Sequence, residues 1–439
     1  MSRTAVTRGA HAAGSVFPSR AMMLRVPLGR LALAACLGFA LGGCASLGPA
    51  SLDDARLQYN EVVKRTTEEQ LLLNIVRLRY TDTPSSLAVS AIAAQFERSQ
   101  SVGLLPFFAA VGGDASRASF SAVLPQAQAM IADRPTISLT PLDDQDFTRK
   151  LFTPLPLDGV IYLAKTTWPI SKVFRLYLEN LNWVPNAQTA SGPTPRQAPP
   201  VSDFLRGVAA LQALQDRGAI VFGLAEQEEQ VGGSLPAGAV SAADLLEATK
   251  HGLEYRPTPG GRGWRLIRKV SVPVMRLDPD EINAPEMRAF EDAFHLRPGA
   301  TELKITQEAL IPFRSALPRG GATSLDLETR SLLQALYYVS HGVDVPPEHR
   351  ARGLATVTRD AAGGEYDWHE IMRDLFHVKS SAERPTTAHV AVRYKGQWFY
   401  VDEADQDTKS TFSLLVELSR LELAGKTGPG PQLTLPVGR

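Results

Sequence analysis

The sequence predicts an α+β protein made of several modules, in which helices pack on small antiparallel sheets. Some segments repeat apolar residues at three- and four-residue spacing, which is typical of one buried face of a helix. Other segments are short runs of apolar, β-branched and small residues bounded by Gly or Pro, which is typical of strands. A tight turn at Lys395-Gly396 separates two such runs and predicts an antiparallel hairpin.

Composition and charge indicate a folded protein and exclude one class of partner. Of 439 residues, 44% are hydrophobic and 21% are charged, which is the balance of a globular chain. The formal net charge is zero, but residues 1–43 hold five Arg and no acid, so the remainder is acidic by five charges. Nucleic acid is therefore not expected as a partner, because its phosphates need a basic surface.

Residues 44–184 are predicted to form an N-terminal helix, a β-hairpin and a helical module. A capping pattern at Ser51 and Asp54 opens a helix from Asp53 to Tyr80, either continuous or broken once. From Ser85 the residues favour strands, which form a long hairpin with Leu104 to Phe108 near its tip. The hairpin either packs on the helix or places this apolar tip against a bilayer or neighbouring subunits. Three helices are expected after it, at Asp143 to Phe152, Leu157 to Thr166 and Ile170 to Leu181.

Residues 185–200 are predicted to be a Pro-rich linker or exposed loop, because they are rich in Pro, Ser, Thr and Gln and lack periodicity. Residues 201–280 then form a small α+β module. Its first helix opens at Ser202 and ends at Gly218, and a buried strand follows over Ala219 to Leu224. Ser241 with Asp244 opens a second helix. Three more strands are expected over 252–256, 264–267 and 270–277.

Residues 281–439 are predicted to form a C-terminal α+β module. A helix is expected from Leu325 to Ser340, because apolar residues recur on one of its faces, and a short helix from Asp367 to Leu375. The hairpin at Lys395-Gly396 pairs 389–394 with 397–401. A final helix is expected from Thr411 to Ala424.

The stretch Leu41-Gly42-Gly43-Cys44 resembles the lipobox of bacterial lipoproteins. It follows a basic flank with Arg25 and Arg30 and an uncharged apolar run from Leu31 to Leu41. This run is too short for a membrane-spanning helix, which takes about 20 residues, but it has the length of a signal-peptide core. Residues 1–43 are therefore expected to be a lipoprotein signal peptide, cleaved between Gly43 and Cys44.

This resemblance implies a lipid anchor and a location. Cys44 would carry a diacylglyceryl thioether and, after cleavage, an amino group acylated by a fatty acid such as palmitate. Two or three acyl chains hold a protein firmly on a membrane, whereas one is marginal. Ala45 stands where an Asp would signal retention in the inner membrane, so sorting to the outer membrane is expected, with the body facing the periplasm. The other cysteine, Cys36, leaves with the leader, so the mature chain has no disulfide. The candidate starts of translation are Met1, Met22 and Met23, and one of the later two is expected because the leader is unusually long.

Three parts of the body resemble a group of uncharacterised proteobacterial outer-membrane lipoproteins. They are the helix from Gln70 to Arg79, the segment Pro135 to Leu142 and the hairpin and helix from Arg393 to Leu415. The resemblance covers most of the mature chain. It implies a lipoprotein and no particular activity.

Two motifs that resemble known sites lack required residues. Gly425-Lys426-Thr427 resembles the end of a phosphate-binding loop, but Arg420 stands where that loop needs its first Gly. His369-Glu370 resembles part of a zinc-binding helix, but Arg373 occupies the position of the second His. His377, eight residues after His369, is expected to point in another direction. No metal or cofactor is therefore predicted there.

The remaining candidate functional residues are an acidic run and a Ser-His pair. Asp402, Asp405 and Asp407, with Glu403, are weak candidates for a metal site, because hard cations need several oxygen ligands. They lack the mid-loop Gly and terminal Glu of an EF-hand, and are expected instead to cap the helix near Ser410. Ser340-His341 is expected to lie at a helix end with its side chains pointing apart. No G-x-S-x-G motif is present, so no catalytic residue is predicted.

The sequence favours a lipid-anchored outer-membrane protein that acts as a structural or adaptor component of an envelope assembly and is not an enzyme. Its expected partners are the membrane, through the lipid on Cys44, and envelope proteins, with a homo-oligomer as one form of assembly. The alternatives are an envelope hydrolase or transferase, or a solute-binding lipoprotein. A pocket lined by carboxylates with His341, His377 or His389 would favour the enzyme, whereas flat apolar patches and self-association would favour the scaffold.

Overall fold

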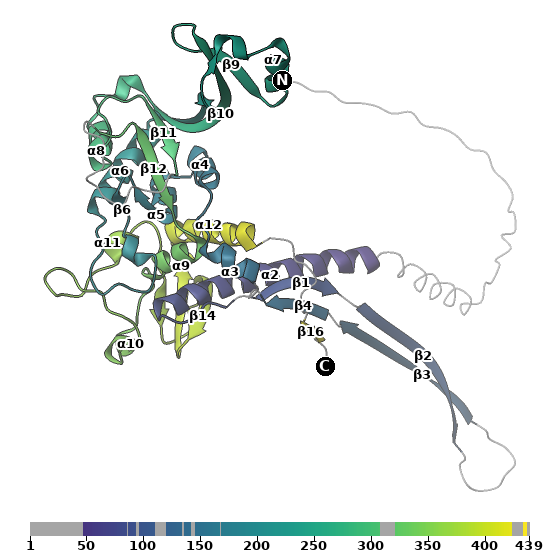
Figure 1. The fold of residues 1–439 in the computed structure, drawn as a ribbon. Coiled ribbons are helices and arrows are strands. Elements are labelled where there is room, and N and C mark those ends of the chain that lie inside the picture. Colours follow the sequence, from purple (N-terminus) through teal and green to yellow (C-terminus); the bar gives the residue numbers. More distant parts are fainter. Residues whose placement is uncertain are drawn as a thin grey trace, which may run out of the picture. The chain divides into compact units, whose positions relative to one another are not determined.

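The computed structural model describes residues 47–85, 87–93, 96–109, 120–133, 136–141, 145–166, 168–307, 321–423 and 433–436. The chain divides into two compact units, 1–63 and 64–439. Helices and sheets alternate irregularly along it, and the predicted α+β class is confirmed. Figure 1 shows the elements in chain order, from purple to yellow.

Helix α2 (Leu47–Arg79) is continuous, which agrees with one of the two forms predicted for this segment. Its C-terminal part is buried on several sides, with Leu72, Ile75 and Val76 fully inaccessible to solvent. Leu57, nearer the N-terminal end of the helix, is 65% exposed. The second unit therefore holds the end of this helix firmly in its core.

The strands expected after Ser85 are present and form two separate sheets. Strands β1 (Leu87–Ala93), β4 (Thr136–Pro141) and β16 (Leu433–Pro436) make an antiparallel sheet in the order β1-β4-β16. Strands β2 (Phe96–Ala109) and β3 (Phe120–Asp133) make the predicted long hairpin, in register from Phe96↔Asp133 to Ala109↔Phe120. Figure 1 draws these two strands side by side.

Helices α3 (Gln145–Phe152), α4 (Leu157–Lys165) and α5 (Ile170–Tyr177) correspond to the three predicted helices. The third was expected to continue to Leu181, but it ends at Tyr177 and the chain becomes strand β5 (Leu178–Leu181). Asn182 and Trp183, both with positive φ, turn the chain into β6 (Val184–Pro185). The apolar residues of β5 have the spacing of a helix, but pairing with other strands of the sheet determines their conformation.

The largest sheet has eight strands, with the order β6-β5-β12-β11-β10-β7 and with β8 and β9 paired to β10. It takes strands from all three parts of the chain that were expected to be separate modules. Only β11 and β12 pair in parallel, and the other pairs are antiparallel. The strands not yet given are β7 (Ile220–Gln230), β8 (Leu235–Pro236), β9 (Leu253–Pro257), β10 (Gly263–Leu277), β11 (Glu302–Thr306) and β12 (Ser324–Thr329).

The expectation of an exposed loop at 185–200 is wrong for much of that segment. Asn186, Ala187 and Ala190 are fully inaccessible, and Ser191 and Thr194 are buried. The amide of Asn186 donates to the carbonyls of Arg175 (2.8 Å) and Leu178 (2.7 Å). This segment is therefore ordered although its sequence has no periodicity, and its polar groups have specific hydrogen-bond partners.

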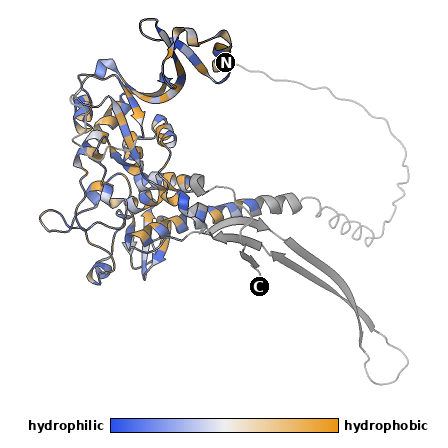
Figure 2. Ribbon diagram, in the orientation of Figure 1, coloured by the Kyte–Doolittle hydropathy of each residue, from blue (hydrophilic) through white to orange (hydrophobic). Residues whose placement is uncertain are grey.

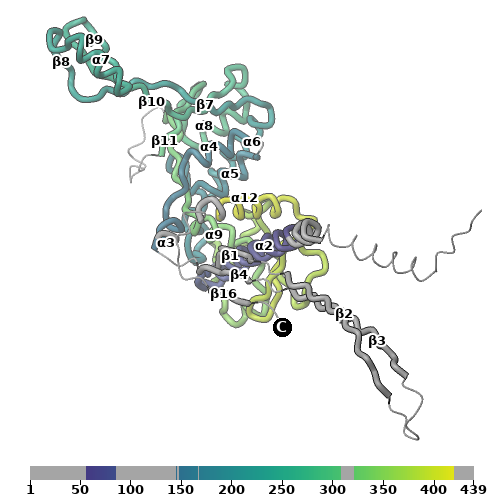
Figure 3. Tube along the Cα trace, turned by 90° about the vertical axis from the view of Figure 1, so that its right-hand side faces the viewer, coloured from purple at the N-terminus to yellow at the C-terminus, as the bar shows by residue number. Residues whose placement is uncertain are grey.

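The predicted elements of residues 201–280 are present with different limits. Helix α6 (Ser202–Asp216) precedes Gly218, whose φ is +73°. Helix α7 (Ala242–Lys250) begins with the predicted capping box of Ser241 and Asp244. The strand expected over 219–224 is longer and largely exposed, and the two strands expected over 264–277 are one, β10. Figures 1 and 3 both place α7 beside β9.

The segment from Leu325 to Ser340, which was expected to be one helix, forms strand β12 and then helix α9 (Leu332–Ser340). A capping box of Ser331 and Gln334 marks the start of α9. The predicted hairpin is confirmed as β14 (Ala388–Tyr394) and β15 (Gln397–Asp402). Lys395 and Gly396 both have positive φ, as a two-residue type I′ turn requires. The remaining elements are helices α8 (Pro285–Ala293), α10 (Pro347–Ala351), α11 (His369–Met372) and α12 (Gln406–Leu423) and strand β13 (Lys379–Ser381).

One continuous hydrophobic cluster runs through the second unit, from Leu71 in α2 to Val416 in α12. It includes Phe204 of α6, which meets Phe294 edge to face at 5.7 Å. Hydrophobic and hydrophilic residues are interleaved along the coloured elements in Figure 2, as expected where each helix or strand has one buried side. The cluster holds together the segments that carry the candidate site.

Candidate functional site

The predicted lipidation site, Cys44 with the cleavage position at Gly43, lies outside the described residues. The Gly425-Lys426-Thr427 motif lies outside them as well. Among the helices that the structure describes, none combines the length and the apolar character needed to cross a bilayer. The lipid anchor therefore stays a prediction from the sequence.

The acidic run before α12 makes specific contacts with neighbouring groups. Asp405 accepts from the backbone N–H (3.0 Å) and the hydroxyl (2.7 Å) of Thr408, so it caps α12, which begins four residues before Ser410. Asp402 pairs with Lys379 at 2.8 Å, and this hydrogen bond holds the pKa of its carboxyl below the usual value. Asp407 pairs with Lys172 at 2.9 Å, and Glu403 pairs with Lys409. Capping and ion pairing account for all four acids.

Asp344, His369 and His377 form the densest group of potential metal ligands in the described part of the chain, with one ligand atom from each within 4.8 Å of the others. His369 Nε2 lies 3.4 Å from Asp344 Oδ1, and His377 Nε2 lies 3.0 Å from Asp344 Oδ2. The two imidazole rings meet edge to face, with centroids 4.6 Å apart. The expectation that His377 points away from His369 is therefore wrong.

The reason is a chain reversal just after α11. The helix ends at Met372, and Asp374 has a φ of +57°, so the seven residues between the two histidines do not continue one helix. Arg175 stabilises this reversal, because its guanidinium donates to the carbonyls of Ile371 (2.6 Å) and Arg373 (2.7 Å). The helical spacing rule does not apply across such a turn.

Backbone hydrogen bonds fix Asp344 beside the segment of His377. The N–H of Asp344 donates to the carbonyl of Val378 (2.9 Å), and the N–H of Val378 donates to the carbonyl of Gly342 (2.9 Å). A Cβ on Gly342 would lie 2.3 Å from the carbonyl oxygen of Phe376, so only glycine permits this close crossing. Two of the three side chains are therefore placed by the backbone itself.

A polar cavity of about 570 Å³ opens beside this cluster. Asp344 and His369 line it, together with the cations Arg79 and Arg350, the acid Glu365 and the buried His341. Arg350 pairs with Glu365 at 2.9 Å. Burial lowers the pKa of Arg79 to about 10, so this side chain is still a cation at neutral pH. The cavity thus brings together carboxylates, cations and histidines from segments far apart in the sequence.

His341 is held neutral in the wall of this cavity. Its pKa is lowered to about 3, chiefly by burial and also by the charges of Arg79 and Arg330, and a hydrogen bond to Tyr337 partly opposes these effects. Its Nδ1 lies 2.8 Å from the carbonyl oxygen of Tyr337, so Nδ1 carries the proton and Nε2 keeps a lone pair. No described residue forms a hydrogen bond with Nε2.

Ser340 and His341 do not point apart as expected, because Ser340 Oγ lies 3.4 Å from Nδ1 of His341. The hydroxyl donates to the carbonyl of Tyr337 at 2.7 Å. Since Nδ1 of His341 is itself a donor, it has no lone pair with which to take a proton from the hydroxyl. This pair therefore lacks the geometry of an activated nucleophile.

His389 takes no part in this site. Its Nδ1 lies 3.5 Å from Glu403, and its ring packs edge to face with Phe412. It is not among the residues that line the polar cavity.

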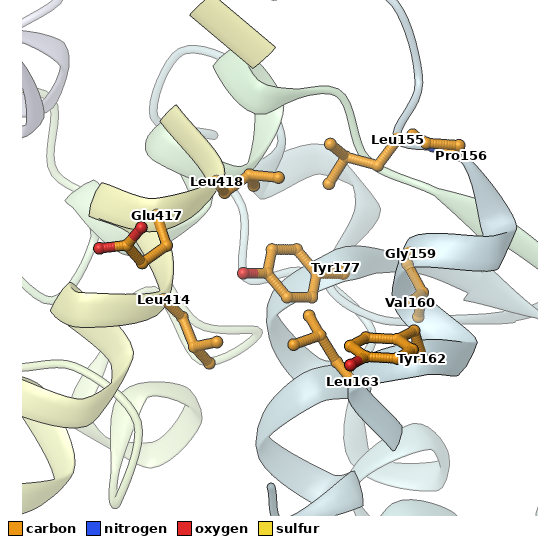
Figure 4. A pocket seen from close by; sticks show the side chains of 10 residues that line it. All are labelled: Leu155, Pro156, Gly159, Val160, Tyr162, Leu163, Tyr177, Leu414, Glu417 and Leu418. Carbon is orange, nitrogen blue, oxygen red and sulfur yellow. The ribbon is translucent and has the colours of Figure 1, made fainter. Parts of the chain in front are cut away.

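Two further cavities lie elsewhere in the second unit. One, of about 880 Å³, contains Glu179 and Glu328, and burial raises the pKa of Glu328, with repulsion from Glu179 and Asp326 adding to the effect. The other, of about 510 Å³, is mainly apolar. Figure 4 shows Leu414, Glu417 and Leu418 of one helix facing Tyr177 and the side chains of α4 across it. It holds a single carboxylate, Glu417, and no histidine.

Asp344 was not recognised from the sequence, because it lies 25 positions before His369 and belongs to no motif. The only sequence signal was the pair of histidines near the short α11, which spacing alone could not bring together. Comparison of the chain with known families, with curated proteins and with solved structures gave no match.

Proposed function

We propose that this chain is a lipid-anchored outer-membrane protein that acts as a structural or adaptor component of an envelope assembly, and that the β2–β3 hairpin is its assembly element. The lipobox at Leu41 to Cys44 supports the anchor. The pairing of β2 and β3 supports the role in assembly, and it is the observation on which the proposal mainly rests.

The hairpin pairs only with itself among the described strands. Each of its strands has 14 residues, and an isolated two-stranded sheet is at best marginally stable in water. Each of its strands has an outer edge that no described strand pairs, and such an edge is the usual template for adding another strand. Pro106 of β2 and Pro125 of β3 lack a backbone N–H.

The composition of the hairpin changes along its length. Glu97, Arg98 and Asp133 lie in the half near β1 and β4, whereas 102–109 and 120–127 contain no charged residue. Ser121 and Gln126 are the polar residues in these two ranges, and the other residues are apolar or small. Such a segment suits burial against other copies of the hairpin, in a bilayer or in a protein ring. In a bilayer the edges would also have to close on one another.

The test compares three forms of the full chain, extracted from membranes in detergent. The wild type is expected to sediment as an oligomer, and Phe107→Ser with Phe108→Ser is expected to reduce it to a monomer that is still lipidated. Cys44→Ser is expected to lose its fatty acid and to appear in the soluble fraction. Analytical ultracentrifugation, fractionation and mass spectrometry of the N-terminal peptide are the measurements.

Two outcomes would contradict the proposal separately. An unchanged sedimentation coefficient in the double Phe variant would remove the hairpin as the assembly element. A Cys44→Ser form that matures and fractionates like the wild type would remove the anchor.

The alternative of an envelope hydrolase is favoured by one observation, the polar cavity with Asp344, Glu365 and His341 in its wall. A hydrolase of this kind should cleave simple chromogenic esters. Hydrolysis of 4-nitrophenyl phosphate and 4-nitrophenyl acetate by the purified chain is the measurement, with Asp344→Asn as the inactive control. Rates that are equal in the two forms would argue against this alternative.

A further inference from the structure

The distances in the Asp344, His369 and His377 cluster are compatible with the binding of one metal ion. Ligand atoms at about 2.0–2.1 Å from a tetrahedral zinc lie about 3.3 Å apart. The two Asp344 oxygens lie 3.4 and 3.0 Å from the Nε2 atoms of His369 and His377. A zinc ion could therefore enter with small movements of the side chains.

The types of ligand select the class of metal. Two imidazoles and one carboxylate suit zinc and other late transition metals, whereas calcium and magnesium prefer oxygen ligands alone. Both histidines present the same nitrogen, Nε2, to a single carboxylate. In the described part of the chain, the carboxylate of Asp344 contacts these two imidazoles and forms no ion pair with Lys or Arg.

The backbone of each of the three residues is held by a hydrogen bond from outside the cluster. The backbone pairing of Asp344 with Val378 fixes two of them, and the N–H of His377 donates to Thr408 at 2.9 Å. His369 begins α11, where its N–H donates to Asp367 at 2.9 Å. Affinity for a metal rises when little order has to be created on binding.

One coordination position would stay open. Three protein ligands and a free fourth position are typical of catalytic zinc sites, where that position holds water or a ligand. Asp344 and His369 line the polar cavity of about 570 Å³, so this position is accessible from it.

We propose that Asp344, His369 and His377 form a zinc site at the wall of this cavity. Binding requires neither the lipid on Cys44 nor the β2–β3 hairpin, so this inference does not depend on the proposed scaffold function.

Isothermal titration of the untagged full chain in detergent, first stripped with EDTA, tests the proposal. ZnCl₂ is expected to bind with one high-affinity equivalent, and His369→Ala and Asp344→Asn are each expected to weaken it at least about tenfold. His369 is suited to this test because 53% of its side chain is exposed, so truncation should not unfold the protein. Thermal unfolding of each metal-free variant checks this directly.

The matched control is His251→Ala. His251 is an exposed histidine that contacts a carboxylate, Glu247, at 3.3 Å but belongs to no cluster of three ligands. Its removal is expected to leave zinc binding unchanged. The proposal fails if zinc binds equally to the wild type and to His369→Ala, or if magnesium binds as tightly as zinc.

Discussion

Replacing Arg330 by methionine is expected to destabilise the protein by about 3–5 kcal/mol, because several buried acceptors would lose their donor at about 1–3 kcal/mol each. Arg330 is completely buried. Its guanidinium donates to the carbonyls of Arg175 (2.9 Å), Leu178 (2.6 Å) and Asn186, and to the hydroxyl of Ser191 (2.9 Å). Methionine fills most of the volume but supplies no donor, so buried carbonyls lose their partners.

The environment of Arg330 makes this loss hard to compensate. Its guanidinium also lies 3.9 Å from the centre of the Tyr338 ring, and within the described part of the chain it has no carboxylate as an ion-pair partner. Burial lowers its pKa to about 10, so it is charged throughout the neutral range. Lysine at this position would keep the charge but could not reach carbonyls on several sides at once, so Arg330→Lys is also expected to be destabilising.

Urea unfolding followed by circular dichroism measures the effect. Arg393→Met is the control, because Arg393 lies exposed on β14, and its change is expected to stay within about 0.5 kcal/mol. A loss below about 1 kcal/mol in Arg330→Met would show that the carbonyls find water instead, and that the guanidinium does not organise this part of the fold.

Arg330 also explains why the segment 185–200 could not be assigned correctly from its sequence. Its Pro, Ser and Thr content is that of a linker, and no periodicity marks it as buried. It is ordered because Asn186 and Ser191 bond to a guanidinium that lies about 140 positions further along the chain. A pattern within a short window contains no information about such a partner.

Elements with their own local chemistry were predictable. The capping box of Ser241 and Asp244 and the turn at Lys395-Gly396 set the start of α7 and the β14–β15 hairpin through interactions between near neighbours. By contrast, Leu178 to Leu181 and 324–329 have apolar patterns compatible with a helix, and they are strands because they pair with each other. Their conformation depends on a long-range partner.

In the candidate site, too, local features were visible in the sequence and long-range contacts were not. The two histidines were visible in the sequence, but the turn at Asp374 is made by a residue other than glycine with positive φ, for which the sequence contains no strong signal. Asp344 joins them through the bridge between Val343 and Val378, a pairing of segments 35 positions apart. The residue types of the site could be found from the sequence, and their assembly could not.

Acidification from pH 7 to pH 4 is expected to cost the metal-free protein about 3 kcal/mol through His341 alone. In the folded protein the pKa of His341 is lowered to about 3, chiefly by burial, whereas in the unfolded chain it returns to 6.5. Below pH 6.5 the unfolded state therefore binds a proton that the folded state does not bind until about pH 3. Stability is full above the unfolded pKa and falls as the pH decreases through this window.

Substitution His341→Asn isolates this contribution, because its amide N–H₂ can still donate to the carbonyl of Tyr337 but does not titrate. Unfolding free energies of both forms, measured in EDTA at intervals between pH 7 and pH 4, give two curves. Carboxylates contribute equally to both, so the difference between the curves belongs to His341. We expect the wild type to lose about 3 kcal/mol more than His341→Asn over this range. Parallel curves would show that the imidazole takes up its proton without unfolding the site, and that the buried side chain is hydrated.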